Sequence, residues 1–297
     1  MVRYRPLRGA TLGASGGPQM RLLRPIEVRA KQFAWIVTEP LVDVFDPAAA
    51  AFYHRLASSG YEPDVLLNVL PSRRLLYVVV PKAASTRIRQ TLARAGGRRI
   101  LSLKPSRRLR YSGPHGPRSM TKSSFFRLAT NPDTLRFSFV RNPYARAVSC
   151  WADKFRGKPL VSGDHFIDLY LARRREIASD LPAGPDRTLT FPEFVTFLAA
   201  VANRRCDIHF QFQDDILSMP GITLDLVGRV ESFAGDFARV LDHLGADETL
   251  RREAAVPLNE SRHDYWASYY TPELADRVYR TYECDFDRFA YPRAHAP

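Results

Sequence analysis

The sequence feature that most constrains the fold is an uninterrupted apolar run at residues 75–80, Leu-Leu-Tyr-Val-Val-Val, which ends at Pro81. A strand without alternating polar residues is typical of a sheet that is covered on both faces. Lys82 and several small residues follow, and then a helical pattern that Gly96 and Gly97 end. This order of strand, turn and helix predicts an α/β fold.

Further segments repeat the alternation of strands and helices. The sequence predicts strands at residues 135–140 and 224–230, and a long loop at residues 98–122. Helical patterns lie at residues 48–58, 86–94, 143–155, 190–201, 236–244 and 271–282. Such an alternation favours a mostly parallel sheet flanked by helices, and these sheets bind ligands at the carboxyl ends of their strands.

Length and composition indicate a globular chain. The 297 residues are 45% hydrophobic and 25% charged. No apolar run approaches the roughly 18 residues of a membrane-spanning helix. Residues 1–30 are basic and contain several Gly and Pro residues, so we expect a flexible N-terminal arm there. We expect residues 31–297 to form a single domain.

The balance of charges favours an anionic partner. The 44 basic and 31 acidic residues give a net charge of +13, which attracts nucleic acid, nucleotides or acidic polysaccharides. A solvated arginine-rich surface would give the same composition. The three cysteines are too few and too scattered for a disulfide framework, and the first residues lack the apolar centre of a secretory signal. We therefore expect a cytoplasmic protein without a transmembrane segment.

The first candidate site directly follows the apolar run described above. Ala83 and Ala84 are small, so an anion can approach the backbone N–H groups at the start of the next helix, where the helix dipole favours negative charge. Lys82 adds a positive charge, and Ser85 and Thr86 add hydroxyl donors. The pattern predicts a phosphate-binding turn, although it lacks the Gly-x-x-x-x-Gly-Lys-Ser/Thr order of a Walker A loop. An ordinary turn with a surface lysine is the alternative.

The second candidate site follows the strand at residues 135–140. Arg141 lies at the end of that strand, and a helical pattern begins at Pro143. Ser149 comes eight residues after Arg141, so it can face the same side as the start of the helix. A guanidinium fork and a short hydroxyl donor suit a phosphate group. The spacing alone also fits an arginine in a surface salt bridge.

Together the two sites resemble sulfotransferases that use 3′-phosphoadenosine 5′-phosphosulfate (PAPS). The Pro-Lys-x-x-Ser-Thr motif at residues 81–86 resembles their 5′-phosphosulfate loop. The Phe-Val-Arg-Asn-Pro-Tyr-x-Arg-x-x-Ser motif at residues 139–149 resembles their 3′-phosphate-binding strand and helix. Three downstream segments are similar to carbohydrate sulfotransferases of the HNK-1 and chondroitin/dermatan type: residues 207–213, 225–231 and 259–291.

The chain also departs from the pattern of that family. Phe210 stands where those enzymes have Trp, and Phe212 stands where they have Pro, both on the acceptor side. Many eukaryotic members carry an N-terminal membrane anchor and luminal cysteines. This chain shows neither feature, so we expect a soluble, bacterial-type member of the family.

The resemblance implies a P-loop-like parallel sheet, PAPS as the donor, and transfer of its sulfuryl group to a hydroxyl of a carbohydrate or glycoconjugate. Lys82 would stabilise the charge that develops on the oxygen between sulfur and phosphorus. The turn at residues 83–86 would hold the 5′-phosphate, and Arg141 and Ser149 would hold the 3′-phosphate. No metal is implied.

The acceptor hydroxyl needs a base, and His209 is the first candidate. It lies in the family-like segment Asp-Ile-His-Phe, whose apolar residues can keep the imidazole neutral. His115, in the long basic loop, is the second candidate. Glu193 and Glu231 are further candidates, but Glu193 is placed to form a capping box and Glu231 to cap the helix after its strand. A purely packing role for His209 is the alternative.

Two other functions are left open by the sequence. A P-loop kinase or NTPase would also bind phosphate at a turn between strand and helix, but the Walker A motif is missing. An arginine-rich nucleic-acid-binding protein fits the charge, but no known nucleic-acid-binding motif supports it, and we expect no such partner. The acceptor, a glycan or glycolipid, is not identified by the sequence, and a peripheral membrane contact also stays open.

Overall fold

The computed structural model of the chain describes residues 45–58, 63–97, 116–178, 181–203, 206–255 and 265–293. Within these residues, four strands form one sheet in the order β1-β2-β3-β4. They are β1 (Leu67–Leu70), β2 (Leu75–Val78), β3 (Leu135–Val140) and β4 (Leu226–Arg229). Strands β2, β3 and β4 are parallel and β1 pairs antiparallel with β2, so the mostly parallel α/β sheet is confirmed.

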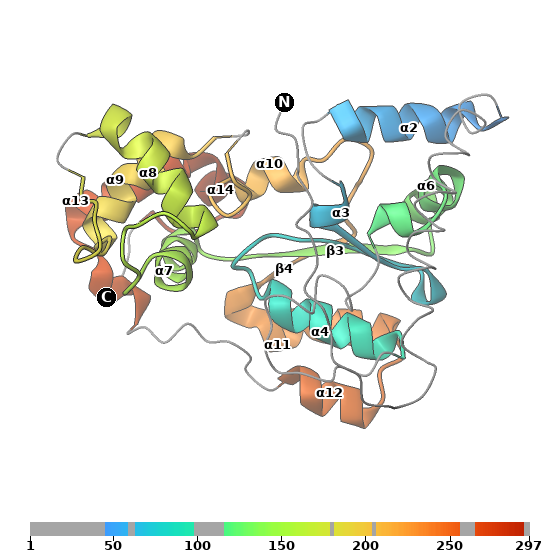
Figure 1. Ribbon diagram of the computed structural model, residues 1–297. Coiled ribbons are helices and arrows are strands. Elements are labelled where there is room, and N and C mark those ends of the chain that lie inside the picture. Colours follow the sequence, from blue (N-terminus) through green and yellow to red (C-terminus); the bar gives the residue numbers. More distant parts are fainter. Residues whose placement is uncertain are drawn as a thin grey trace, which may run out of the picture.

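Helices cover both faces of the sheet, as Figure 1 shows. The side chains of β2 alternate between two apolar cores, with Leu75 and Tyr77 in one and Leu76 and Val78 in the other. All four side chains are buried. Burial on both faces explains why this strand shows no polar alternation in the sequence.

The smaller core lies between the sheet and three helices, α4 (Ser85–Ala95), α11 (Phe233–His243) and α12 (Glu248–Ala255). Each of α4 and α11 buries a stripe of residues spaced three or four apart, such as Ile88 and Leu92 in α4. In Figure 1 these three helices lie below the sheet. Packing in this core holds α4, and therefore the turn that precedes it, against the sheet.

The larger core lies on the opposite face and joins helices from distant parts of the chain. Helix α2 (Pro47–Ser58) packs against α6 (Lys122–Thr130), and α7 (Pro143–Lys154) packs against α9 (Phe191–Val201) and α13 (Pro272–Thr281). The remaining α-helices of the described residues are α3 (Pro63–Leu66), α8 (His165–Ile177), α10 (Gln213–Leu217) and α14 (Glu283–Arg288). Short 3₁₀-helices lie at Pro71–Arg73, Pro117–Ser119, Val230–Ser232 and Trp266–Tyr269.

The structure contains elements that the sequence-based expectation lacks. They are strand β1 and the helices α3, α6, α8, α10, α12 and α14. Helix α6 begins at Lys122, at the end of the segment expected to be a loop, and α14 directly follows the helix expected at residues 271–282. The arm at residues 1–30 and most of the long loop lie outside the described residues. Within the described part of the chain, every helix is too short or too polar to span a lipid bilayer.

The parallel pairing places both candidate sites at one edge of the sheet. Strands β2 and β3 are neighbours, so their carboxyl ends meet there. Helix α4 begins shortly after β2, and α7 begins at Pro143 shortly after β3. Strand β4, parallel to β3, ends at the same edge and leads to Glu231. Three strand ends thus supply side chains to a common region.

Candidate active site

The turn between β2 and α4 has an unusual backbone. Lys82 has a φ of 69° and Ala84 a φ of 56°, whereas Ala83 between them has a negative φ. An alternation of this kind turns successive N–H groups toward one side and forms a concave anion site. Non-glycine residues adopt a positive φ at an energetic cost, so the surroundings must hold the turn in place. The buried Ala83 side chain, in the larger core, provides one such anchor.

The start of α4 presents backbone donors near this turn. Helix α4 begins at Ser85, and no side chain caps it, because the preceding residue is Ala84. Uncapped N–H groups together with the positive end of the helix dipole favour an anion. This backbone can accept an anion, and phosphate binding at residues 83–86 stays a prediction.

The side chain of Lys82 is held by an ion pair across the site. Its Nζ lies 3.1 Å from Oδ2 of Asp153, and Nζ of Lys154 lies 2.9 Å from the same oxygen. Burial lowers the pKa of Lys82, and the charge of Asp153 opposes that shift. Burial alone would raise the pKa of Asp153, but the two lysines outweigh it and lower the pKa to about 2. Asp153 is therefore ionised at neutral pH and keeps Lys82 charged.

Arg141, at the end of β3, is clamped by a buried glutamine. The amide oxygen of Gln213 accepts from Arg141 N at 2.9 Å, and its amide nitrogen donates to Arg141 O at 2.9 Å. Gln213 is fully buried, so both backbone groups of Arg141 are paired away from water. The Arg141 guanidinium donates to Lys82 O at 3.3 Å. The structure thus joins the two candidate phosphate sites.

The start of α7 is held by its cap residue Asn142 and also by Glu231, which comes later in the chain. Asn142 caps α7 with its side chain, which accepts from Tyr144 N at 2.9 Å. Glu231 Oε1 accepts from Asn142 N at 2.8 Å, and its Oε2 accepts from Tyr291 Oη at 2.9 Å. The expectation that Glu231 caps the helix after its own strand is therefore wrong. One of its oxygens serves the end of β3 instead, and the other binds Tyr291.

Two other expected residues lie on helices around the site. Ser149 precedes Asp153 by four residues on α7, so helical spacing places it on the face that meets Lys82. It is 3% exposed. Glu193 forms the expected capping box at the start of α9, because its carboxylate accepts from Thr190 N at 2.8 Å. This contact accounts for Glu193 without a catalytic role.

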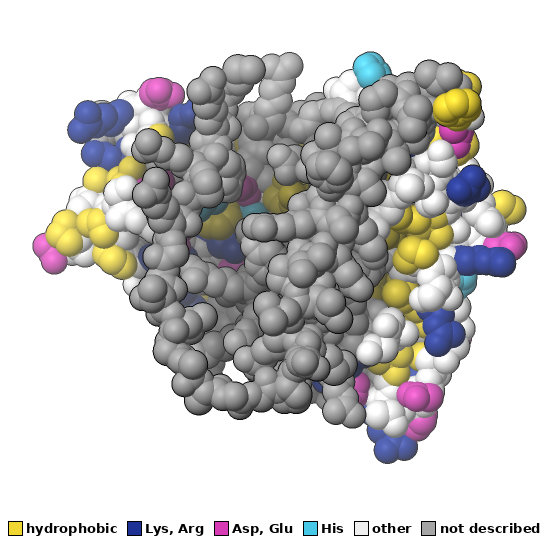
Figure 2. Space-filling model, turned by 45° about the vertical axis from the view of Figure 1, so that its right-hand side comes forward, with side chains coloured by type: hydrophobic (Ala, Val, Ile, Leu, Met, Phe, Trp, Pro, Cys, Tyr) yellow, Lys and Arg dark blue, Asp and Glu magenta, His cyan; other side chains and the backbone are white. Residues whose placement is uncertain are grey.

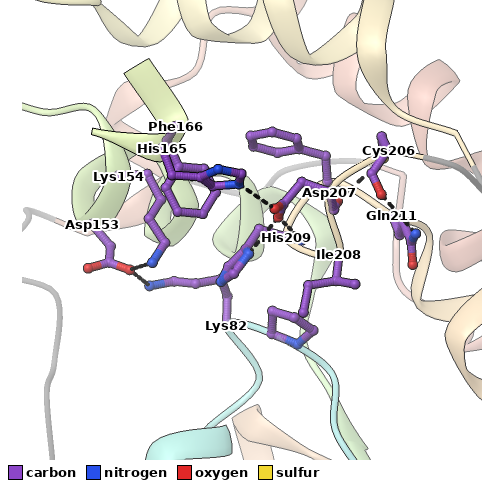
Figure 3. Close-up of polar contacts among 12 residues, drawn as sticks. Lys82, Asp153, Lys154, His165, Phe166, Cys206, Asp207, Ile208, His209 and Gln211 are labelled. Carbon is purple, nitrogen blue, oxygen red and sulfur yellow. Dashed lines mark hydrogen bonds and ion pairs between the residues drawn. The ribbon is translucent and has the colours of Figure 1, made fainter. Parts of the chain in front are cut away.

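His209 lies beside Lys82, as Figure 3 shows. Its Nδ1 is 2.7 Å from Oδ1 of Asp207, and its ring meets Phe166 edge-on at 5.0 Å between centroids. Burial lowers the pKa of His209 below its ordinary 6.5, and Lys154 and Lys82 lower it further, whereas Asp207 raises it. The imidazole is neutral at pH 7 and can accept a proton. The other candidate base, His115, lies outside the described residues.

The two aromatic departures from the family pattern serve packing. Phe210 is fully buried and contacts the rings of Phe155, Phe194 and Phe197. Phe212 packs edge-on against Tyr282 at 5.7 Å between centroids. Phe210 therefore packs in the core, whereas the His209 ring lies beside Lys82.

Arg146 is a site residue that the sequence reasoning did not single out. It is 3% exposed, and its guanidinium donates to Pro81 O at 3.2 Å and to Gln211 O at 2.8 Å. It also donates to the backbone oxygens of Ile208 and His209, each at 3.4 Å. One buried arginine thus ties the Lys82 turn to the His209 segment. The signal in the sequence was an arginine among the apolar residues of α7, because an arginine is buried only when several groups accept its hydrogen bonds.

A comparison of the sequence with models of protein families bears on the same residues. The model of the Sulfotransferase family matches residues 66–292, which is most of the chain and includes every described site residue. The chain belongs to the sulfotransferase family. Membership explains why motifs far apart in the sequence meet at one edge of the sheet.

Curated sulfotransferases are similar to the chain at moderate identity. Mouse carbohydrate sulfotransferase 8 is 28% identical over 74% of this chain and 55% of its own length. Human carbohydrate sulfotransferase 14 is 32% identical over 53% of this chain and 42% of its own length. Zebrafish carbohydrate sulfotransferase 11 is 24% identical over 76% of this chain and 66% of its own length. The chain spans about half the length of these relatives, and no solved structure matches it significantly.

One residue of the C-terminal sulfotransferase-like motif supports the site through buried hydrogen bonds. Asp285 is fully buried, and its two oxygens accept from Gln213 N at 3.0 Å and from Asp214 N at 2.8 Å. It thereby caps the short helix α10, whose first residue clamps Arg141. Among the described residues, no three His, Cys, Asp or Glu side chains gather in a way that could hold a metal ion.

Proposed function

We propose that this protein transfers a sulfuryl group from PAPS to a hydroxyl group of a carbohydrate. Membership of the sulfotransferase family supports the reaction, and the similarity to carbohydrate sulfotransferases supports the acceptor class. The observation that carries the proposal is one juxtaposition at the edge of the sheet. There the Arg141 guanidinium donates to Lys82 O, and Arg146 donates to both Pro81 O and His209 O. These contacts form one framework, in which the His209 ring lies beside Lys82.

The framework suits the two phosphates of the donor. The backbone of residues 83–86, with the hydroxyls of Ser85 and Thr86, would hold the 5′-phosphosulfate, and the positive φ of Lys82 and Ala84 and the uncapped start of α4 support this. Arg141 and Ser149 would hold the 3′-phosphate, which distinguishes this donor from ATP. The carbonyl of Lys82 accepts from the Arg141 guanidinium, so the two proposed phosphate sites are adjacent. Two separate cationic positions on one rigid edge fit a donor with two phosphate groups.

The side chains also suit the transfer itself. The acceptor oxygen forms a bond to sulfur while the bond from sulfur to the bridging oxygen breaks, and the electron pair goes to that oxygen. Lys82 stabilises the charge that develops there. His209 takes the proton of the acceptor hydroxyl. Asp153 favours the charged form of Lys82, and burial favours the neutral form of His209 by lowering its pKa.

The surface charges are consistent with a local anion site. On the face shown in Figure 2, lysine and arginine side chains of the described residues are interspersed with acidic ones. Many of the arginines are engaged in ion pairs, such as Arg74 with Asp133 and Arg251 with Asp242. The proposal therefore rests on the cationic groups at the edge of the sheet and not on the net charge of the chain.

A labelled-donor assay tests the proposed function. The protein is incubated with ³⁵S-labelled PAPS and four acceptor classes: neutral oligosaccharides, uronate-containing polysaccharides, glycolipids and simple phenols. We expect label on a carbohydrate, none on the phenols, and no ³²P transfer from γ-labelled ATP. Transfer to phenols alone would contradict the acceptor class. Phosphoryl transfer from ATP would contradict the reaction class.

A further inference from the structure

We propose that Asp207 is a positioning residue that holds His209 in the tautomer with its proton on Nδ1, which leaves Nε2 to accept the proton of the acceptor hydroxyl. The inference deepens the proposed function and rests on it. It assigns a role to a carboxylate that does not itself contact the donor turn.

The geometry restricts the orientation of the imidazole strongly. Oδ1 of Asp207 accepts from the backbone N of His209 at 3.0 Å and lies 2.7 Å from Nδ1 of the same residue. Phe210 N donates to Asp207 O at 2.8 Å, so the three residues form one closed turn. Both side chains are mostly buried, with 18% of Asp207 and 23% of His209 exposed. The carboxylate and the ring are thus fixed relative to each other by the backbone.

The charge of Asp207 decides which ring nitrogen carries the proton. Burial would raise the pKa of Asp207, but its contacts with His209 outweigh this and hold the pKa well below its usual range. An ionised carboxylate only accepts hydrogen bonds, so Nδ1 must donate. In a neutral imidazole the other nitrogen, Nε2, then has a free lone pair.

Phe166 fixes the remaining freedom of the ring. It packs at 88° to the His209 ring, and Nζ of Lys154 lies 4.7 Å from the centroid of Phe166. Rotation of the imidazole would break both the Asp207 contact and this edge-on packing. In Figure 3 the imidazole extends from Asp207 toward the Lys82 side chain. Nε2 is therefore held on the side where the sulfur of the donor is expected.

Several charged groups face this imidazole from the elements around it. Lys82 comes from the donor turn, and Lys154 with its partner Asp153 comes from α7. His165, at the start of α8, places Nε2 3.1 Å from the second oxygen of Asp207. The two lysines oppose a second proton on His209, whereas Asp207 favours it. When His209 has taken the acceptor proton, the charge of Asp207 stabilises the imidazolium without itself becoming protonated.

The decisive measurement is the tautomer of His209, read from ¹⁵N shifts of histidine-labelled protein at pH 7.5. We expect a protonated Nδ1 and an unprotonated Nε2 in the wild type. In Asp207→Asn the amide can also donate, so we expect a mixture of tautomers. A wild-type ring with its proton on Nε2 overturns the inference even if the variant fails to fold.

The kinetic arm uses the same variant. Asp207→Asn should lower kcat on the order of 10²-fold or more while PAPS affinity changes less than about threefold. Since Asp207 raises the pKa of His209, its loss should also shift the acid limb of kcat/KM to lower pH. Asp168→Asn, the same change at an α8 residue that bonds Ser162 and Gly163, should alter neither.

The outcomes separate this inference from the proposed function. If the wild type transfers no sulfuryl group to any carbohydrate, the proposed function fails, and this is read before any variant is made. If the wild type is active but Asp207→Asn keeps both its tautomer and its kcat within about threefold, the positioning role is overturned and the function stands.

Discussion

The two strand ends at the active edge are held by different kinds of contact. After β2, the turn is strained and uncapped, and the Lys82 side chain is held by a charge on the neighbouring helix α7. After β3, Arg141 and Asn142 are held through their backbone groups by Gln213 and Glu231. These partners come 72 and 89 residues later in the chain.

The difference fits the roles proposed for the two ends. A group proposed to stabilise charge during transfer needs a side chain whose partner can be exchanged, and an ion pair at 3.1 Å provides that for Lys82. A group proposed to recognise a phosphate needs an immobile backbone, which neutral hydrogen bonds from a buried glutamine provide for Arg141. We therefore expect changes at the end of β2 to affect turnover and changes at the end of β3 to affect donor recognition or stability.

The largest effect is expected for Lys82→Ala. Removal of one preorganised electrostatic group lowers kcat on the order of 10²–10³-fold at comparable sites. PAPS binding should weaken far less, because the backbone of residues 83–86 remains. Initial rates with labelled PAPS and calorimetry with the product nucleotide measure the two quantities. Lys158→Ala, which breaks another lysine ion pair at 3.0 Å, is the matched control. Wild-type turnover in Lys82→Ala would remove Lys82 from the mechanism.

The next effect is expected for Arg141→Ala, at the other strand end. A charge-assisted contact made only to the 3′-phosphate is worth about 1.5–3 kcal/mol, so the affinity for 3′,5′-ADP should fall by that amount. The affinity for 5′-AMP should hardly change. Calorimetry with both nucleotides decides the question, and equal losses would mean that Arg141 supports the fold or the 5′-phosphate. Arg74→Ala, which breaks an exposed ion pair before β2, should change neither.

Much of the β2 end could be predicted because its determinants are contiguous. A six-residue apolar run, a proline and small residues lie next to one another, and each follows from local pattern and helix-dipole chemistry. Strand β3 and helix α7 were predictable for the same reason. Strand β1 was missed because Asn68 interrupts its apolar pattern. Asn68 is buried, and its side chain accepts from Arg89 Nε at 2.9 Å, a partner on α4 that no local pattern reveals.

The β3 end could be predicted only in part. The motif singles out Arg141 and Ser149 as candidates, whereas the contacts of Gln213, Glu231 and Arg146 depend on tertiary structure. An arginine in a helix is usually exposed, and the burial of Arg146 depends on hydrogen bonds to the backbone oxygens of two distant segments. Sequence alone indicates that such residues belong to a motif, whereas the structure shows which atoms they hold.

A smaller effect is expected for Gln213→Ala, which breaks the clamp on Arg141. Each buried backbone group left without a partner costs about 1–3 kcal/mol, so the free energy of unfolding should fall by at least that much. Discrimination between 3′,5′-ADP and 5′-AMP should also weaken, but less than in Arg141→Ala. Gln211→Ala is the matched control, since that buried amide donates to Cys206 O instead. A full loss of discrimination in Gln211→Ala would contradict the clamp.

The smallest effect is expected for Tyr291→Phe, which removes one hydrogen bond from Glu231. Burial, together with the charge of Glu231, raises the pKa of Tyr291 above its usual range, so the hydroxyl donates throughout the working pH range. Its loss should lower the free energy of unfolding by about 0.5–1.5 kcal/mol, measured by urea denaturation. Tyr265→Phe, at a ring that is 61% exposed, should leave stability unchanged.

The same variant also tests whether Glu231 serves as the base. In the structure both oxygens of Glu231 are engaged, by Asn142 N and by Tyr291 Oη. If Glu231 only supports the start of α7, Tyr291→Phe keeps the pH dependence of kcat/KM, since His209 still sets the acid limb. If Glu231 were the base, loss of the Tyr291 hydrogen bond would shift that limb. A shifted limb in Tyr291→Phe, with no shift in Asp207→Asn, would move the role of base from His209 to Glu231.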